Sequence, residues 1–198
     1  GGDTNIDLNL IAKGAGTVNA NGGYIVSSAN AQTVILQGLF NQALINGSFD
    51  VWQRNTTFTT PNDDTYGVDR WNFLVETNGS WTFARDTDTP TGIGTYSLKA
   101  TNVTLDNQCA IVQIIENVNA RKFASGLANL SFYAKTNSTE IANLRATVLS
   151  WSSTADTVTS DVISAWASDG TDPTFAANWT KEVAGSNLAL TSTWTKYE

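Results

Sequence analysis

Histidine and methionine are absent from this chain of 198 residues, and Cys109 is its single cysteine. Without histidine, the commonest general base, the commonest metal ligand and every Ser–His or Cys–His relay are excluded. A lone cysteine excludes an intrachain disulfide. Its neighbours in Gln108–Val112 are mostly apolar, which favours a small core residue over a nucleophile; a thiol on the solvent side is the alternative. Because translation starts with methionine, we expect a fragment or a processed product of a longer chain.

Charged residues are also scarce and unbalanced. They make up 15% of the chain, with a net charge of −7, whereas about 25% is typical of globular domains. The negative charge excludes nucleic acid and anionic lipid as expected partners. No apolar run of 18 residues and no signal peptide occur, so we expect no membrane insertion. Short polar side chains take the place of charges, which suits an all-β protein that works outside a cell.

Short strands separated by glycine are predicted in the first part of the chain, residues 1–43. Ile6, Leu8 and Leu10 alternate along one such strand, and glycine-containing breaks at 13–16 and 21–23 separate it from two more. Strands this short bury too little surface to stand alone, so partner chains are expected. A flexible Gly/Asn-rich linker is the alternative. The apolar spacing within residues 34–44 fits one face of a short helix.

From Leu44 to Glu198 the pattern predicts an all-β domain. Many short strands separated by polar turns are typical of a sandwich. No amphipathic stretch longer than about 12 residues predicts a helix, although Asn117–Ala124 has room for a helical turn. The predicted strands are Ser48–Gln53, Trp71–Glu76, Ser80–Asp86, Tyr96–Val103, Ala110–Asn117, Ala128–Thr136, Asn143–Trp151, Val158–Ala167 and Thr193–Glu198.

The stretch Leu44–Trp71 carries the most specific motif. It contains an Asn46-Gly47 turn dipeptide, then F-D-V-W-Q-R, a polar loop and D-R-W. This pattern resembles the opening of jelly-roll carbohydrate-binding domains found in phage tail and virion proteins. The family has glycine after the Q-R pair, whereas this chain has Asn55, the next best residue for a left-handed backbone.

Later segments extend the resemblance. Gly94–Lys99, Gly126–Lys135 and Leu190–Tyr197 are similar to three strands of the same modules. In the family at least one more strand follows the last of these, so the resemblance implies a sandwich that is incomplete at Glu198. The opening D-T-N-I-D-L unit is similar to intertwined trimeric β-structure in phage fibre and tail-spike proteins. The expected architecture is therefore a trimerisation stem, residues 1–43, and a jelly-roll β-sandwich, residues 44–198.

Enzymatic chemistry is not expected. Glycoside hydrolysis needs two carboxylates across a cleft, and nothing in the spacing of the acidic residues pairs them. No phosphate loop, zinc spacing or serine elbow occurs. The resemblance implies that a structural calcium is possible. Asp50 is the residue expected to contribute to such a calcium site; the alternative is that Asp50 is a hydrogen-bonded aspartate at a strand end. Asp63-Asp64 would bind a cation only loosely.

Glycan binding is the remaining kind of site. Aromatic rings can cover the C–H face of a sugar, while amide, carboxylate and guanidinium groups can bind its hydroxyls. Alternation places Leu144, Ala146 and Val148 inward, so that their neighbours along the strand face outward. If the outward faces of three predicted strands adjoin, they form an aromatic and polar groove. The predicted glycan-binding residues are Gln113, Tyr133, Arg145 and Trp151.

Most of the seven tryptophans are expected in the core, where Trp52, Trp71 and Trp81 lie beside apolar residues of period two. The segment Ser152–Leu188 is a long excursion that contains Trp166 and further aromatic residues. It either packs on its own domain or meets a partner.

The resemblance implies a non-enzymatic phage virion structural protein, in a tail fibre or on the capsid, that attaches to host-surface glycans. A purely architectural role, in which the domain joins virion proteins and binds no sugar, is the alternative. Expected partners are two further copies of the chain, other virion proteins and a host glycan, on the extracellular surface of the virion.

Overall fold

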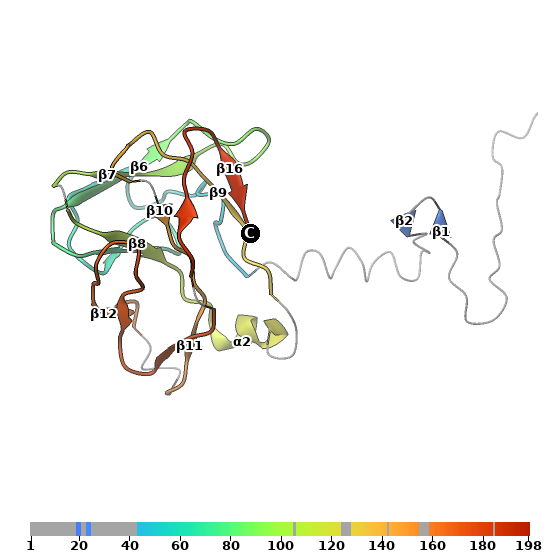
Figure 1. The fold of residues 1–198 in the computed structure, drawn as a ribbon. Helices are drawn as coiled ribbons and strands as arrows, with labels where there is room; N and C mark the ends of the chain where they lie inside the picture. The colour runs from blue at the N-terminus through green and yellow to red at the C-terminus, as the bar shows by residue number, and fades with distance from the viewer. Residues whose placement is uncertain are drawn as a thin grey trace, which may run out of the picture. The chain divides into compact units, whose positions relative to one another are not determined.

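The computed structural model describes residues 19–20, 23–24, 43–104, 106–123, 128–141, 143–154, 159–183 and 185–198 (Figure 1). The chain divides into two units, residues 1–42 and 43–198. In the first unit, β1 (Asn19–Ala20) pairs antiparallel with β2 (Gly23–Tyr24). The predicted strand at Ile6–Leu10 and residues 34–42 of the predicted helix lie outside the described residues.

The second unit is mostly β-structure in small antiparallel sheets, which confirms the all-β prediction. Helical structure among its described residues is limited to α2 (Asn117–Ala120) and the 3-10 turn η1 (Arg121–Phe123), where a helical turn was predicted. One three-stranded sheet has the order β3 (Thr57–Thr59), β6 (Trp81–Asp86), β7 (Ser97–Asn102). The other has the order β4 (Thr65–Tyr66), β5 (Asn72–Val75), β8 (Cys109–Val112).

The core lies where these two sheets face each other. Phe73 of β5 stacks on Phe83 of β6, with ring centroids 4.0 Å apart and an interplanar angle of 7°. Both side chains are 0% exposed. Trp71 and Trp81 belong to the same buried cluster and Trp52 packs against it, so the prediction that these tryptophans build the domain is confirmed.

The second half of the unit is a set of nested antiparallel pairs. Strands β9 to β12 pair in turn with β16 to β13, so that the last strand of the chain pairs with the first of this set. β11 and β12 lie in the lower part of Figure 1. The excursion Ser152–Leu188 contributes β12, β13 and β14, so it packs on its own domain, as one of the two alternatives predicted. The pairs are β9 (Phe132–Ala134) with β16 (Thr195–Tyr197), β10 (Asn143–Leu144) with β15 (Leu188–Ala189), β11 (Leu149–Trp151) with β14 (Trp179–Lys181), and β12 (Ile163–Ala165) with β13 (Thr174–Phe175).

The strand predicted at Ser48–Gln53 is wrong. Residues 48–53 form no strand, because Asn46 and Phe49 have φ of 55° and 59° and a turn joins the Phe49 N–H to the Asn46 carbonyl at 3.1 Å. The Asn46 side chain replaces the sheet ladder: its Oδ1 accepts from the N–H of Val51 at 3.0 Å, and its Nδ2 donates to the carbonyls of Val51 and Asp69. This side chain fixes the corner that leads into the core.

Candidate functional site

Gln113, the first of the predicted glycan-binding residues, lies just after β8 and binds the chain's own backbone. Its Oε1 accepts from the Ile45 N–H at 2.7 Å, and its Nε2 donates to the Ile45 carbonyl at 2.8 Å. An amide side chain that satisfies both backbone groups of one residue works like a strand pairing. Gln113 thus holds the start of the domain against the β4–β5–β8 sheet.

Arg145 follows β10 and uses every N–H of its guanidinium within the nested pairs. Nε and Nη2 donate to Oδ1 of Asp172 at 3.0 and 2.7 Å, and Nη1 donates to the carbonyl of Gly170 and to Oδ1 of Asn187. The remaining Nη2 hydrogen reaches the carbonyl of Gly185 at 2.5 Å. Because arginine has five donors and no acceptor, no donor is left over for a ligand in this conformation.

Asp172 is the anionic centre of this cluster. Lys181 forms an ion pair with the same carboxylate, and the hydrogen bonds from Lys181 and Arg145 hold the pKa of Asp172 below its ordinary value. The arrangement ties together loops that lie between β10 and β15, which gives it a structural role.

Tyr133 and Trp151 lie on two further sheets. Tyr133 on β9 is 40% exposed and stands opposite Lys196 of β16. Trp151 on β11 is half-buried, contacts the Trp179 ring at a centroid distance of 5.2 Å, and donates from Nε1 to the Thr154 carbonyl at 3.0 Å. Among the described residues, no hydrogen bond, ion pair or ring contact joins any two of the four residues predicted for the groove.

The alternation assumed for residues 143–151 is wrong. Leu144 and Val148, predicted to face inward, are 37% and 44% exposed, while Arg145 and Trp151, predicted to face outward, are half-buried. The single predicted strand is divided into β10 and β11 by a non-strand segment, and an irregular segment does not preserve the period of two.

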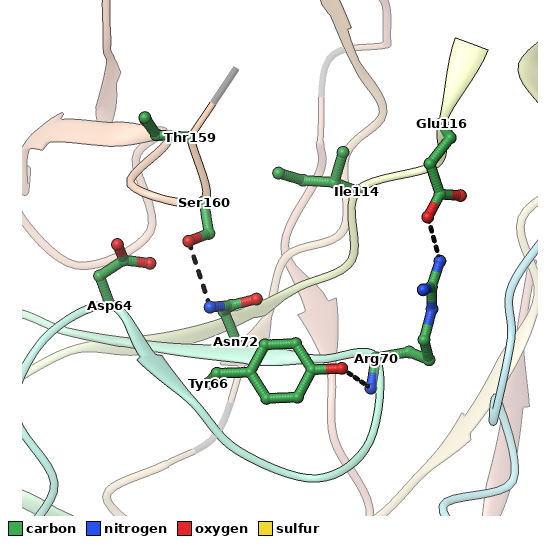
Figure 2. A pocket seen from close by; sticks show the side chains of 8 residues that line it. All are labelled: Asp64, Tyr66, Arg70, Asn72, Ile114, Glu116, Thr159 and Ser160. Carbon is green, nitrogen blue, oxygen red and sulfur yellow. Dashed lines mark hydrogen bonds and ion pairs between the residues drawn. The ribbon is translucent and has the colours of Figure 1, made fainter. Parts of the chain in front are cut away.

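A pocket of about 480 Å³ lies elsewhere, at the β4–β5–β8 sheet (Figure 2). Tyr66 comes from β4 and Asn72 from β5, while further lining residues follow β8 or precede β12. The pocket therefore joins segments that are far apart in the sequence. Its lining consists of Asp64, Tyr66, Arg70, Asn72, Ile114, Glu116, Thr159 and Ser160.

The D-R-W motif builds one side of this pocket. A tight turn links Trp71 N–H to the Val68 carbonyl at 2.8 Å, and Arg70 within it has a φ of 77°. The Arg70 N–H then donates to the Tyr66 hydroxyl at 2.8 Å, and its guanidinium forms an ion pair with Glu116. Figure 2 shows both contacts. The ion pair lowers the pKa of Glu116 through the hydrogen bond from Arg70.

The pocket retains polar atoms that can bind a ligand. Asp64 lines the pocket, and its carboxylate belongs to no ion pair among the described residues. Its Oδ1 is buried and has no hydrogen-bond partner in the described part of the chain. Nδ2 of Asn72 donates to Oγ of Ser160 at 3.1 Å, which leaves the Ser160 hydroxyl hydrogen and the Asn72 carbonyl oxygen for a ligand. The Tyr66 hydroxyl likewise accepts from Arg70 and keeps its hydrogen. The site thus offers donors and acceptors side by side.

Tyr66 adds an aromatic surface. It is 39% exposed, and the Arg54 guanidinium lies 3.9 Å from its ring centroid. A cation stacked on a tyrosine ring restricts the ring's rotation and is stabilising by about 0.5–1 kcal/mol at exposed sites. The stacked Arg54 therefore helps to fix the orientation of Tyr66 at the pocket.

The described residues contain no group of three or more His, Cys, Asp or Glu that could hold a metal ion. Asp50 instead accepts hydrogen bonds from the N–H groups of Thr95 and Tyr96 at 2.7 and 2.9 Å and from the Ser48 hydroxyl at 2.8 Å. These donors, Thr95 first, lower the pKa of Asp50. The alternative predicted for Asp50, a hydrogen-bonded aspartate, is confirmed, although the residue lies outside any strand.

Sequence reasoning missed the pocket. Residues 64–70 were predicted as part of a polar loop and the D-R-W motif, and Asn72 as part of the strand Trp71–Glu76; the D-D-T-Y and D-R-W clusters were the only local signal. Comparison with protein-family models, curated proteins and solved structures finds no match to this chain. No helix among the described residues is long and apolar enough to cross a membrane.

Proposed function

We propose that the unit formed by residues 43–198 is a non-enzymatic carbohydrate-binding domain of jelly-roll type in a phage virion protein, and that the pocket beside Tyr66 binds a host-surface glycan. The observation that carries this proposal is the pocket itself, which places an exposed tyrosine ring beside polar atoms that have no partner or a spare hydrogen-bonding capacity.

Sugars match this lining chemically. A pyranose ring presents C–H groups to an aromatic face and vicinal hydroxyls that both donate and accept hydrogen bonds. Tyr66 supplies the aromatic surface, while Asp64 and Asn72 accept and Ser160 donates. A volume of about 480 Å³ falls in the range of small-ligand sites and suits one or two sugar residues. The pocket is open to solvent, as a receptor for the end of a surface polysaccharide requires.

The wider assignment rests on the sequence resemblance and on the fold. Two facing antiparallel sheets around an aromatic core are compatible with a jelly roll. The motif at residues 44–71 gives the connection to phage virion proteins. The fibre-like segment at residues 1–43 gives the connection to a trimeric stem that joins other virion proteins and displays the domain on the particle surface.

The proposal is tested by screening the full chain on a glycan array. We expect specific binding that Tyr66→Ala abolishes and Tyr133→Ala preserves, because the two tyrosines are 39% and 40% exposed but Tyr66 alone lines the pocket. Equal loss of exposed aromatic surface makes Tyr133→Ala a matched control. Circular dichroism establishes that each variant is folded.

Two results would refute the proposal in different ways. If binding survives Tyr66→Ala but disappears with Tyr133→Ala or Trp151→Ala, the glycan site lies in the groove predicted from the sequence and not in the pocket. No binding by a well-folded trimer would favour the architectural alternative, in which the domain joins virion components without a sugar.

A further inference from the structure

The two ends of the pocket differ in charge. Figure 2 shows Asp64, Thr159 and Ser160 at one end, Arg70 and Glu116 at the other, and the remaining polar side chains between them. At the second end the arginine and the glutamate form an ion pair and neutralise each other. The Asp64 end has no such compensation, which makes it the negative end of the pocket.

Asp64 is not the only carboxylate at this end. Asp63 and Asp161 lie close enough to act on one another electrostatically: burial and then the charges of Asp63 and Asp64 raise the pKa of Asp161. None of the ion pairs among the described residues includes any of the three. Asp63 has a hydrogen bond from the Val75 N–H at 2.8 Å, whereas Oδ1 of Asp64 is buried without a donor.

A carboxylate that lines a pocket without an ion-pair partner favours a ligand that supplies positive charge and hydrogen-bond donors. A metal ion would need several such ligands in a closed arrangement, which the described residues do not provide. A sugar ammonium group instead carries donors and a charge on a frame that also offers hydroxyls to Asn72 and Ser160. A sugar carboxylate would be repelled at the same position.

On the basis of the proposed glycan-binding function, we infer that the pocket selects amino sugars, with the protonated amino group paired with the carboxylate of Asp64. The order of preference is free amine, then N-acetylated amine, then uronic acid. The N-acetylated sugar keeps an N–H donor but loses the charge, and the uronic acid brings a second negative charge to an uncompensated carboxylate.

The test displays glucosamine, galactosamine and mannosamine at equal density in the free-amine and N-acetylated forms, together with the matching uronic acids, to the full chain. For at least one sugar we expect the free amine to bind about fivefold to tenfold more tightly than the N-acetylated form, because hydrogen bonds to charged groups are stronger than neutral ones. Asp64→Asn, which removes the charge and nearly preserves the shape, should abolish this preference.

Two further variants act as controls. Asp106→Asn changes the net charge equally at an exposed position outside the pocket lining and should keep the preference, which excludes a general attraction of cations to the acidic chain. Asp161→Asn should reduce the preference for the free amine without removing it. This variant tests the same inference if Asp64→Asn does not fold.

The outcomes separate this inference from the proposed function. Equal binding of free-amine and N-acetylated sugars, or an unchanged preference in a folded Asp64→Asn variant, would overturn the inference while glycan binding stands. Loss of the preference in Asp106→Asn would also overturn it. Absence of binding to any sugar in the test and on the array would overturn both.

Discussion

Gly67 lies so close to the Phe73 ring that any side chain at this position would collide with it. A Cβ built on Gly67 would be 2.0 Å from Cε2 and 2.3 Å from Cζ of Phe73. The ring has no room to retreat, because it stacks on Phe83 at 4.0 Å and meets Phe58 edge-on at 5.3 Å. Gly67→Ala therefore forces the core or the β4–β5 connection to move.

The expected cost follows from two opposing effects. Overpacking a buried core costs about 1–3 kcal/mol, and contacts this short belong at the upper end. Replacing glycine by alanine also restricts the unfolded chain, which offsets about 0.4–1 kcal/mol. We expect Gly67→Ala to lower the free energy of unfolding by about 2 kcal/mol. For a domain of this size, that corresponds to a Tm lower by about 4–8 °C.

Urea denaturation followed by tryptophan fluorescence measures this difference. Gly47→Ala is the matched control, since the nearest heavy atom to its added Cβ is Leu44 Cβ at 3.7 Å, and it should be neutral or slightly stabilising. Phe73→Leu should cost less in the Gly67→Ala background than in the wild type, because the smaller side chain relieves the collision. A stability of Gly67→Ala within about 0.5 kcal/mol of the wild type would refute the packing argument.

The remaining predictions concern single side chains. Arg145→Lys should lower the free energy of unfolding by about 2 kcal/mol, because an ammonium group cannot reproduce the forked contacts to Asp172 and the neighbouring carbonyls; a neutral result in urea denaturation would contradict this. Asp50→Asn should be destabilising by about 1–2 kcal/mol at pH 7. The pKa of Asp50 is lower in the folded chain. Its contribution to the free energy of unfolding is therefore complete above the unfolded pKa near 3.8 and is lost as the pH falls through the folded pKa. The denaturation curves of the wild type and Asp50→Asn should converge in acid, and a difference in stability that does not change with pH would contradict the assignment. Burial raises the pKa of the Cys109 thiol to about 12, so a disulfide reagent at pH 8 should label it at least about 100-fold more slowly in the folded than in the urea-unfolded chain; rapid labelling of the folded protein would place the thiol at the surface.

The central strands could be predicted because their signals are local. Trp71, Phe73 and Val75 recur with period two at β5, although Leu74 between them is buried as well, and Trp81 and Phe83 recur with period two in β6. The Asn78-Gly79 turn between the two strands supplies the positive φ of 82° that the connection needs. The core tryptophans followed from the same alternation. Local pattern failed at residues 48–53, where the side chain of Asn46 binds the backbone and replaces a strand ladder.

The predicted groove depended on which strands adjoin, and the sequence carries no local signal for that. Arg145 is engaged by Asp172 and Gly185, and Gln113 by Ile45; these partners lie between 27 and 68 residues away in the chain. The pocket has the same character, since Tyr66, Glu116 and Ser160 meet only through the fold. Chemistry of this kind depends on long-range contacts, which single-sequence periodicity does not describe.

The location of the glycan site is measured most directly by nuclear magnetic resonance titration of the isotope-labelled full chain with the sugar selected on the array. We predict that the signals that shift on binding cluster at Tyr66, Asn72 and Ser160, while those of Tyr133 and Trp151 stay unchanged. Shifts confined to Tyr133 and Trp151, or none with a sugar that demonstrably binds the chain, would contradict a site in the pocket beside Tyr66.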